Sequence, residues 1–173
     1  MKWKWKRNDV IIEEPITEYL TKLFDKEIEN NRTFKVSVGT DSQKGGGKGN
    51  YKFATVILIT SKEDLGGGVT VGRGGMVIAA TYYHTFKRRQ PKELVNERMV
   101  FEVGKSVEAA YEIAPLLDIY GVPMEIHADI NPNPEYESNK ALQTAVGYIL
   151  GMGYSFKIKP DAWASSTCAD KLC

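Results

Sequence analysis

The chain has few cysteines, few histidines, almost no net charge and no long hydrophobic run. Its 173 residues include two cysteines and two histidines, and 23 Lys and Arg nearly balance 22 Asp and Glu, for a net charge of +1. Two cysteines are too few for a disulfide framework or for a zinc site built on cysteine pairs. A nearly neutral chain gives no global argument for nucleic-acid binding, so any such argument has to be local.

Long apolar segments are absent as well. No stretch reaches the roughly 18 uninterrupted apolar residues of a membrane span, and the first residues, MKWKWKRNDVIIEEP, lack the apolar core of a secretory signal. We therefore expect a cytoplasmic protein without a membrane partner. With 42% hydrophobic residues, the chain is long enough for one domain with a substantial core.

The order of helix-like and strand-like segments predicts the fold class. We expect an amphipathic helix at 14–30 and a long helix from Pro91 to just before Gly121. Strands are expected at about 34–41, 51–60 and 76–86, in PMEIHADI and in YSFKIK, with helices at about 138–150 and from Ala162 onward. Three antiparallel strands followed by alternating helices and strands predict an α/β domain with a mixed five-stranded sheet and flanking helices. Residues 1–32 then form an accessory N-terminal helix, and residues 33–173 form the main domain.

Two acids stand where this fold would bring strand ends together. Asp41 follows the first apolar strand, and Asp129 follows the strand within PMEIHADI. If these strands pair in parallel, at a spacing of about 4.8 Å, their acids meet at one edge of the sheet. Period two places Glu125, His127 and Asp129 on one face of the second strand. Acids that share an edge in this way can hold one or two cations.

Further acids lie on the predicted helices. Glu97 shares a stripe of the long helix with Val100, Phe101, Gly104 and Val107, which predicts an acid embedded in an apolar face. Asp170 lies on the last helix, and Asp161 lies in the loop before it. Glu97 falls on the helix surface if the helix phase is shifted by one position, and Glu93 is then the substitute.

Each of these acids also has an ordinary structural interpretation. Asp41, followed by Ser, Gln, Lys and three glycines, is typical of a turn, and so is Asp129 before Asn and Pro. Asp161 is typical of a helix N-cap, and Asp170 of a solvated acid. Only the conjunction of these acids in one fold favours a metal site.

Several short motifs resemble the ribonuclease H fold. They are VGTDSQ on the first strand, a helix glutamate in NERMVFEVG, HADIN on the fourth strand and ADKL on the last helix. More narrowly, VGTDSQ, HADINPNP and KPDAWASSTCADK are similar to a small bacterial ribonuclease H-like family whose members are largely of unassigned function. The resemblance covers about residues 33–173. It implies that Asp41, Glu97, Asp129 and Asp170 bind two Mg²⁺ or Mn²⁺ ions, with Asp161 as a fifth candidate.

The resemblance also implies a nuclease. Two cations about 3.5 to 4 Å apart can activate water and stabilise the leaving oxygen of a phosphodiester. RNA, an RNA–DNA hybrid and structured DNA all remain open as substrates. A non-catalytic module that binds nucleic acid or protein is the alternative, and a phosphoester hydrolase acting on a small nucleotide is a third hypothesis.

Substrate contacts are expected close to the acids. The candidates are Ser42, His127, Asn131, Lys87, Arg88 and Arg89, the last three within the basic segment FKRRQPK. That segment is equally typical of a solvated loop, and a hydrogen-bonded structural role is the alternative for His127. Many ribonuclease H enzymes carry a histidine before the last acid, whereas this chain has none between Lys157 and Asp170.

Overall fold

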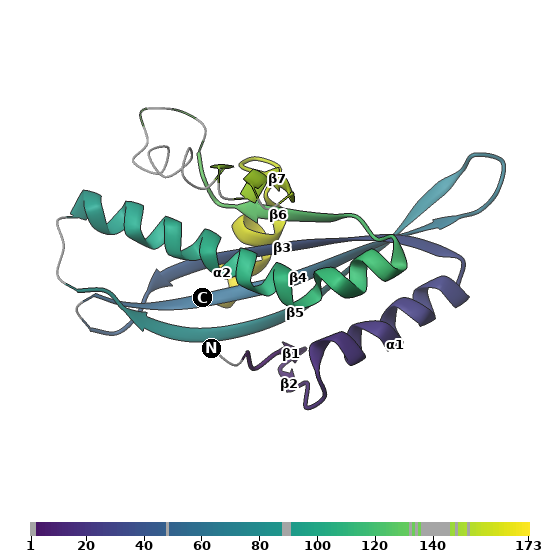
Figure 1. The fold of residues 1–173 in the computed structure, drawn as a ribbon, viewed down its shortest axis with the longest axis horizontal. Helices are drawn as coiled ribbons and strands as arrows, with labels where there is room; N and C mark the ends of the chain where they lie inside the picture. The colour runs from purple at the N-terminus through teal and green to yellow at the C-terminus, as the bar shows by residue number, and fades with distance from the viewer. Residues whose placement is uncertain are drawn as a thin grey trace.

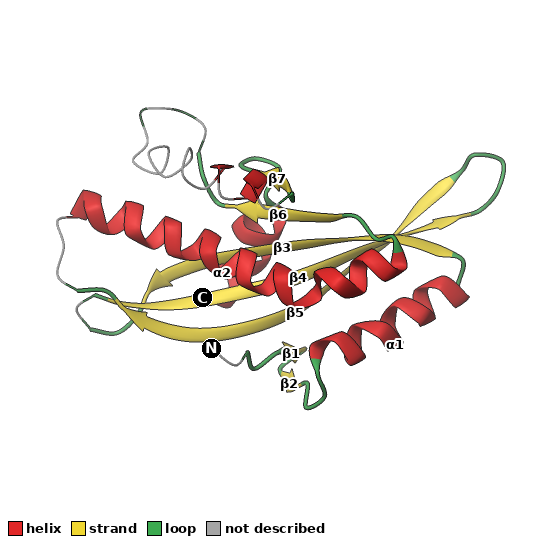
Figure 2. Ribbon diagram, viewed as in Figure 1, coloured by secondary structure: helices red, strands yellow, loops and turns green. Residues whose placement is uncertain are grey.

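A seven-stranded mixed sheet forms the centre of the fold, with helices on both of its faces (Figures 1 and 2). This computed structural model describes residues 3–47, 49–87, 91–131, 133, 135, 146–147, 149–151 and 153–173. Its elements are β1 (Lys6–Arg7), β2 (Val10–Ile11), α1 (Ile16–Glu29), β3 (Arg32–Lys44), β4 (Asn50–Asp64), β5 (Thr70–Thr85), α2 (Pro91–Tyr120), β6 (Met124–Ala128), β7 (Ser155–Lys157), the π-helical segment η1 (Ala164–Ala169) and the 3-10 turn η2 (Asp170–Leu172). The predicted α/β class is confirmed, with a sheet of seven strands rather than five.

Strands β3, β4 and β5 form the predicted antiparallel meander, and β6 and β7 extend it in parallel. The strand order is β2-β1-β5-β4-β3-β6-β7. Strand β3 is longer than expected, because Asp41 still pairs with Ala54 and the strand ends only at Lys44. The interpretation of Asp41 as a turn residue is therefore wrong, and the glycine-rich turn begins after Lys44.

Strand β6 pairs in parallel with β3, as predicted. The register runs from Val36 opposite Met124 to Thr40 opposite Ala128. Because side chains alternate along a strand, Val36 and Ile126 point to the main core, whereas Gly39 and His127 face the other side of the sheet.

Helices α1 and α2 cover one face of the sheet, where the main core lies (Figure 1). Apolar residues of both helices pack on the central strands, including Leu20, Phe24, Val36, Val38, Ile57, Ile59, Ile78, Val103, Val107, Ile113 and Ile126. The buried side of α2 repeats every three or four residues through Met99, Val103, Val107 and Ala110, which is the pattern of a helix lying on a sheet.

The two ends of the chain are tied to the sheet in different ways. Near the start, Trp5 is buried and stacks with Trp3, while Lys6 pairs with Ala79 of β5. The basic, tryptophan-containing start thus leads into β1, which pairs with β2 on one side and β5 on the other. Of the helix expected at 138–150, residues 146, 147, 149 and 150 are helical, and 138–145 and 148 lie outside the described residues. No helix in the described ranges is long and apolar enough to cross a membrane.

The last helix packs on the sheet face opposite α2, as its position behind the strands in Figure 1 shows. Ala164 and Ala169 join a small second core with Ala54, Val56 and Leu58 of β4. The backbones of η1 and β3 approach so closely at Gly39 that a Cβ there would lie 2.6 Å from the nitrogen of Ser165 and 2.9 Å from the carbonyl carbon of Ala164. Glycine at this position is what allows the contact.

We predict that Gly39→Ala destabilises the protein by about 1 to 3 kcal/mol, because the added methyl group has to displace a backbone rather than a flexible side chain. The unfolding midpoint in urea, measured by circular dichroism, reports the change. Gly104→Ala on α2 is the matched control: no neighbouring atom lies within 4 Å of the added Cβ, and alanine should stabilise the helix by up to about 1 kcal/mol. Equal stability of Gly39→Ala and the native protein would contradict the close approach.

Candidate metal and catalytic site

Asp41 and Asp129 meet at the corner where β6 ends and β3 continues. Thr40 opposite Ala128 is the last pair of the parallel register, and the two acids occupy the next position on each chain. The corner lies beyond the arrowhead of β6 in Figure 1. Asp41 is only 8% exposed, and Asp129 is half-buried. The predicted parallel pairing that brings the positions of these two acids to one end of β6 is therefore confirmed.

Glu102 of α2 is the helix acid that reaches this corner. It is 4% exposed, and its Oε1 accepts a hydrogen bond of 2.6 Å from the Ser42 hydroxyl. Ser42 therefore orients an acid, which is a different contact from the substrate contact that the sequence suggested.

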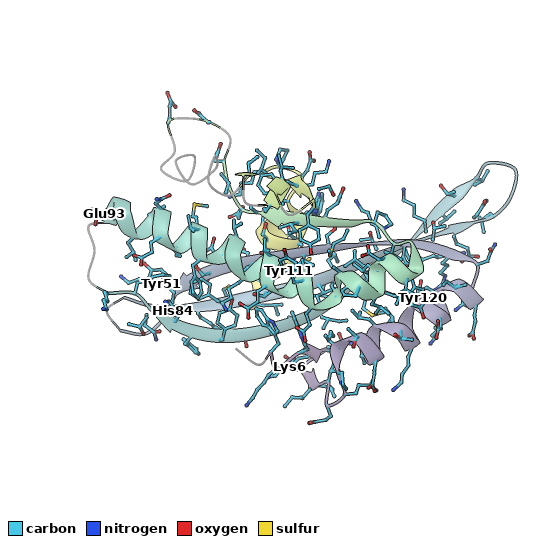
Figure 3. The ribbon with its side chains drawn as sticks, in the orientation of Figure 1. Lys6, Tyr51, His84, Glu93, Tyr111 and Tyr120 are labelled. Atoms are coloured by element: carbon cyan, nitrogen blue, oxygen red, sulfur yellow. The ribbon has the colours of Figure 1, made fainter. Side chains whose placement is uncertain are left out.

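The prediction that Glu97 is embedded in an apolar face is wrong. Glu97 is exposed, and so is Val100, which belongs to the same predicted stripe. Glu93 is exposed as well and lies in the first turn of α2, at the end of the helix in Figure 3. The physical reason is helix phase: the stripe through Met99, Val103 and Val107 faces the sheet and carries Glu102 with it.

Asp170 approaches the corner from η2. Its carboxylate accepts a hydrogen bond of 3.0 Å from Gln43 of β3, two residues after Asp41. Lys52 of β4 donates hydrogen bonds to the carbonyl oxygens of Leu172, at 2.8 Å, and Cys173, at 3.2 Å. These contacts fix the segment that carries Asp170 to β3 and β4, although the Asp170 side chain itself is exposed.

Burial and neighbouring charges raise the pKa of two of these acids, Asp41 and Glu102. Burial is the largest cause that raises the pKa of Asp41 to about 7, and the charges of Asp129 and Asp170 raise it further, against the lowering effects of the Ser42 backbone N–H and Arg98. Burial also raises the pKa of Glu102 to about 8, with Asp41 as the largest charge effect. Because one charge disfavours a second of the same sign nearby, Asp129 lies within electrostatic reach of both Asp41 and Glu102, and Asp170 lies within reach of Asp41.

Two basic side chains, Arg98 and Lys159, partly neutralise the acids at this corner. Arg98 places its Nε 3.6 Å from Glu102 Oε1, and its guanidinium lies 5.3 Å from the ring centre of Tyr51, a residue labelled in Figure 3. Lys159 Nζ lies 2.9 Å from Asp129 Oδ1, at angles that do not make a hydrogen bond. Both acids thus keep acceptor capacity for another ligand.

His127 has a structural role, which was the alternative to substrate contact. It is 3% exposed, its Nδ1 accepts the backbone N–H of Ala164 at 3.1 Å, and its Nε2 lies 3.4 Å from Glu125 Oε2. Burial lowers its pKa and so favours the neutral ring that this acceptor role requires. The bond joins β6 to the start of η1, a contact 37 residues away in sequence that no local pattern could indicate.

The remaining predicted residues lie around the corner or outside it. The Asn131 side chain accepts the backbone N–H of Asn133 and forms a turn, and Lys87 is exposed. Arg88 and Arg89 lie outside the described residues. Asp161 is exposed and lines a groove with Lys157 and Trp163; η1 begins without a side-chain cap hydrogen bond, so nothing supports Asp161 as its N-cap.

The donor chemistry of the corner suits a hard divalent cation. Within the described ranges, no group of three or more His, Cys, Asp or Glu side chains is close enough to hold a metal ion. The acids nevertheless supply only carboxylate oxygens, which Mg²⁺ and Mn²⁺ prefer. Two of them are buried with raised pKa values, so a bound cation would stabilise their charged forms.

We predict that the metal-free protein loses stability as the pH rises. The pKa values of Asp41 and Glu102 are raised to about 7 and about 8 in the folded protein. An acid whose pKa is higher in the folded than in the unfolded state contributes stability that is fully present below about pH 4 and is lost as the pH rises through 7 to 8. Asp41→Asn removes one such charge, so it should be more stable than the native protein at pH 8, by on the order of 1 to 3 kcal/mol, and not at pH 4. Urea unfolding at both pH values measures this, with exposed Glu97→Gln as the control. The prediction would be contradicted if Glu97→Gln also increased the free energy of unfolding at pH 8, or if Asp41→Asn did not.

The family comparison agrees with the fold. Residues 16–173 match the family described as Ribonuclease H-like, and the match includes α1, which the sequence motifs left outside the resemblance. No curated protein matches the chain. With the match extending over most of its length, the chain belongs to the Ribonuclease H-like family.

Proposed function

We propose that the chain is a Mg²⁺- or Mn²⁺-dependent nuclease, in which Asp41, Glu102, Asp129 and Asp170 are the metal ligands. The observation that supports this most is the pair of buried acids on β3 and α2: burial raises the pKa of Asp41 to about 7 and that of Glu102 to about 8, and the charge of Asp129 raises both further. A folded protein rarely keeps carboxylates together in this way without a use for them, because like charges repel.

Bound divalent cations would supply an activated water and charge stabilisation at the scissile phosphate. The chain's own residues prepare the ligands. Ser42 orients Glu102, and Gln43 orients Asp170. Arg98 and Lys159 balance part of the negative charge, and under this proposal both would attract an anionic phosphate to the corner.

A non-catalytic binding module is the second candidate, and one observation favours it. Arg98 and Lys159 already contact two of the acids, and no three-ligand group is formed among the described residues. A protein that had lost turnover could retain the fold with its acids neutralised in this way. Nucleic-acid binding without cleavage at saturating Mn²⁺ would favour this candidate.

We predict that calorimetric titration with Mg²⁺ and Mn²⁺ separates Glu102 from Glu97. Glu102→Gln and Asp41→Asn should weaken metal binding by roughly tenfold or more, since each removes a charged ligand. Glu97→Gln changes the same functional group on the exposed side of the same helix, so it should bind metal as the native protein does.

Cleavage of single-stranded RNA, an RNA–DNA hybrid and branched DNA at saturating metal then tests catalysis. The native protein and Glu97→Gln should cleave at least one substrate, and Asp41→Asn and Glu102→Gln should not. Loss of metal binding in Glu97→Gln alone would show that the ligand on α2 is misassigned. Absence of metal binding in the native protein would reject the metal-dependent function.

A further inference from the structure

A second feature of the molecule is a groove of about 640 Å³ on the sheet face opposite α2. Strands β3, β4, β6 and β7 form its floor, and the start of the last helix forms one wall. Lys35, His127, Lys157, Asp161, Trp163 and Cys168 are among the residues that line it. None of the four proposed metal ligands belongs to its lining, so the groove is a separate surface.

Trp163 stands on the rim of this groove and is 61% exposed. Tryptophan is usually largely buried, because its ring is the largest apolar surface of any side chain. Packing within the chain does not account for a ring left this open beside a groove. An exposed indole is, however, a suitable surface for stacking a planar ligand group.

The groove is connected to the acid corner through β7. Lys157 pairs with His127 in the parallel register, and Lys159 follows two residues later, beyond the end of β7, where its Nζ lies 2.9 Å from Asp129 Oδ1. Two residues of extended chain span at most about 7 Å. Lys157 and Lys159 thus form a basic step from Trp163 to the proposed metal ligands.

The charged side chains that line the groove are partly paired with one another. Glu125 contacts Lys35 at 3.2 Å and His127 at 3.4 Å, so its charge is opposed locally. Lys157 is exposed on β7, and Asp161 is an exposed acid on the rim. A polyanion on this surface would therefore be attracted by Lys157 and repelled by Asp161.

We propose that this groove binds single-stranded nucleic acid, with one base stacked on Trp163 and the adjoining phosphates near Lys157 and Lys159. An aromatic ring beside lysines is the combination that binds single strands without reading their sequence. A duplex offers no free base face at this position, so the groove selects an unpaired segment. The inference rests on the proposed nuclease function in that it gives the substrate class, but the binding itself needs no metal and no turnover.

Binding is measured by fluorescence anisotropy of a labelled 12-mer of deoxythymidine or uridine, in EDTA so that no cleavage occurs. Trp163→Ala should weaken binding by about 5- to 150-fold, the range for loss of one stacked base, and Trp163→Phe should retain most of the affinity. Tyr111→Ala is the matched control, because Tyr111 is also an exposed aromatic residue but lies on α2, on the other face (Figure 3). It should bind as the native protein does.

The charge changes have opposite expected signs. Lys157→Gln should weaken binding and reduce the slope of log affinity against log salt by about 0.7, the value for one phosphate contact on a single strand. Asp161→Asn should strengthen binding. Thermal melts of all variants establish that they are folded, as expected for substitutions of exposed side chains.

Unchanged affinity in Trp163→Ala would overturn the proposal, and so would equal binding of a blunt duplex with the same dependence on Trp163. The outcome for the nuclease is read separately, from metal titration and cleavage by the native protein. Single-strand binding that depends on Trp163 but is never followed by cleavage would support the groove and reject the nuclease. Equal rates of cleavage by the native protein and Trp163→Ala at subsaturating substrate would support the nuclease and reject the groove.

Discussion

The parallel pairing of β6 with β3 is the constraint on which the rest of the structure depends. Its register ends at Thr40 and Ala128, and β3 continues past that point while β6 does not. A parallel pair requires a crossover, and here α2 provides it by passing over one face of the sheet. The helix therefore has to bury a stripe on β3 and β4, and that stripe brings Glu102 to the open corner beside Asp41.

Two acids at the corner carry an unfavourable charge when they are ionised. Burial and mutual repulsion raise the pKa values of Asp41 and Glu102 to about 7 and 8, so the metal-free acids are partly protonated at neutral pH. Ser42, Gln43, Arg98 and Lys159 offset part of the unfavourable charge. A divalent cation would have to displace those protons, so its affinity should increase with pH.

The strand acids were predictable from the sequence, whereas the helix acid was not. Asp41 and Asp129 each follow an apolar strand-like run, and period two together with strand order is enough to place them side by side. The helix pattern is ambiguous, because apolar residues occur on more than one side of α2: Val100 and Phe101 suggest one phase, Met99 and Val103 suggest the other, and Val107 fits both. Contact with the sheet decides between them. The short strands β1 and β2 have two residues each, too few to show any period.

The last helix links the two proposed sites across the other face of the sheet. Gly39 allows η1 to lie directly on β3, and the bond from the Ala164 N–H to His127 fixes where the helix begins. Trp163 precedes that point, and Asp170 lies about two turns later, held by Gln43. Because one short helix carries both residues on a rigid sheet, its placement on β3 sets the separation of the stacking surface and the acid corner. A nucleic-acid strand with one base stacked on Trp163 would then reach the acids a fixed number of nucleotides away. In this way a protein without base-specific contacts can still define which phosphate it positions.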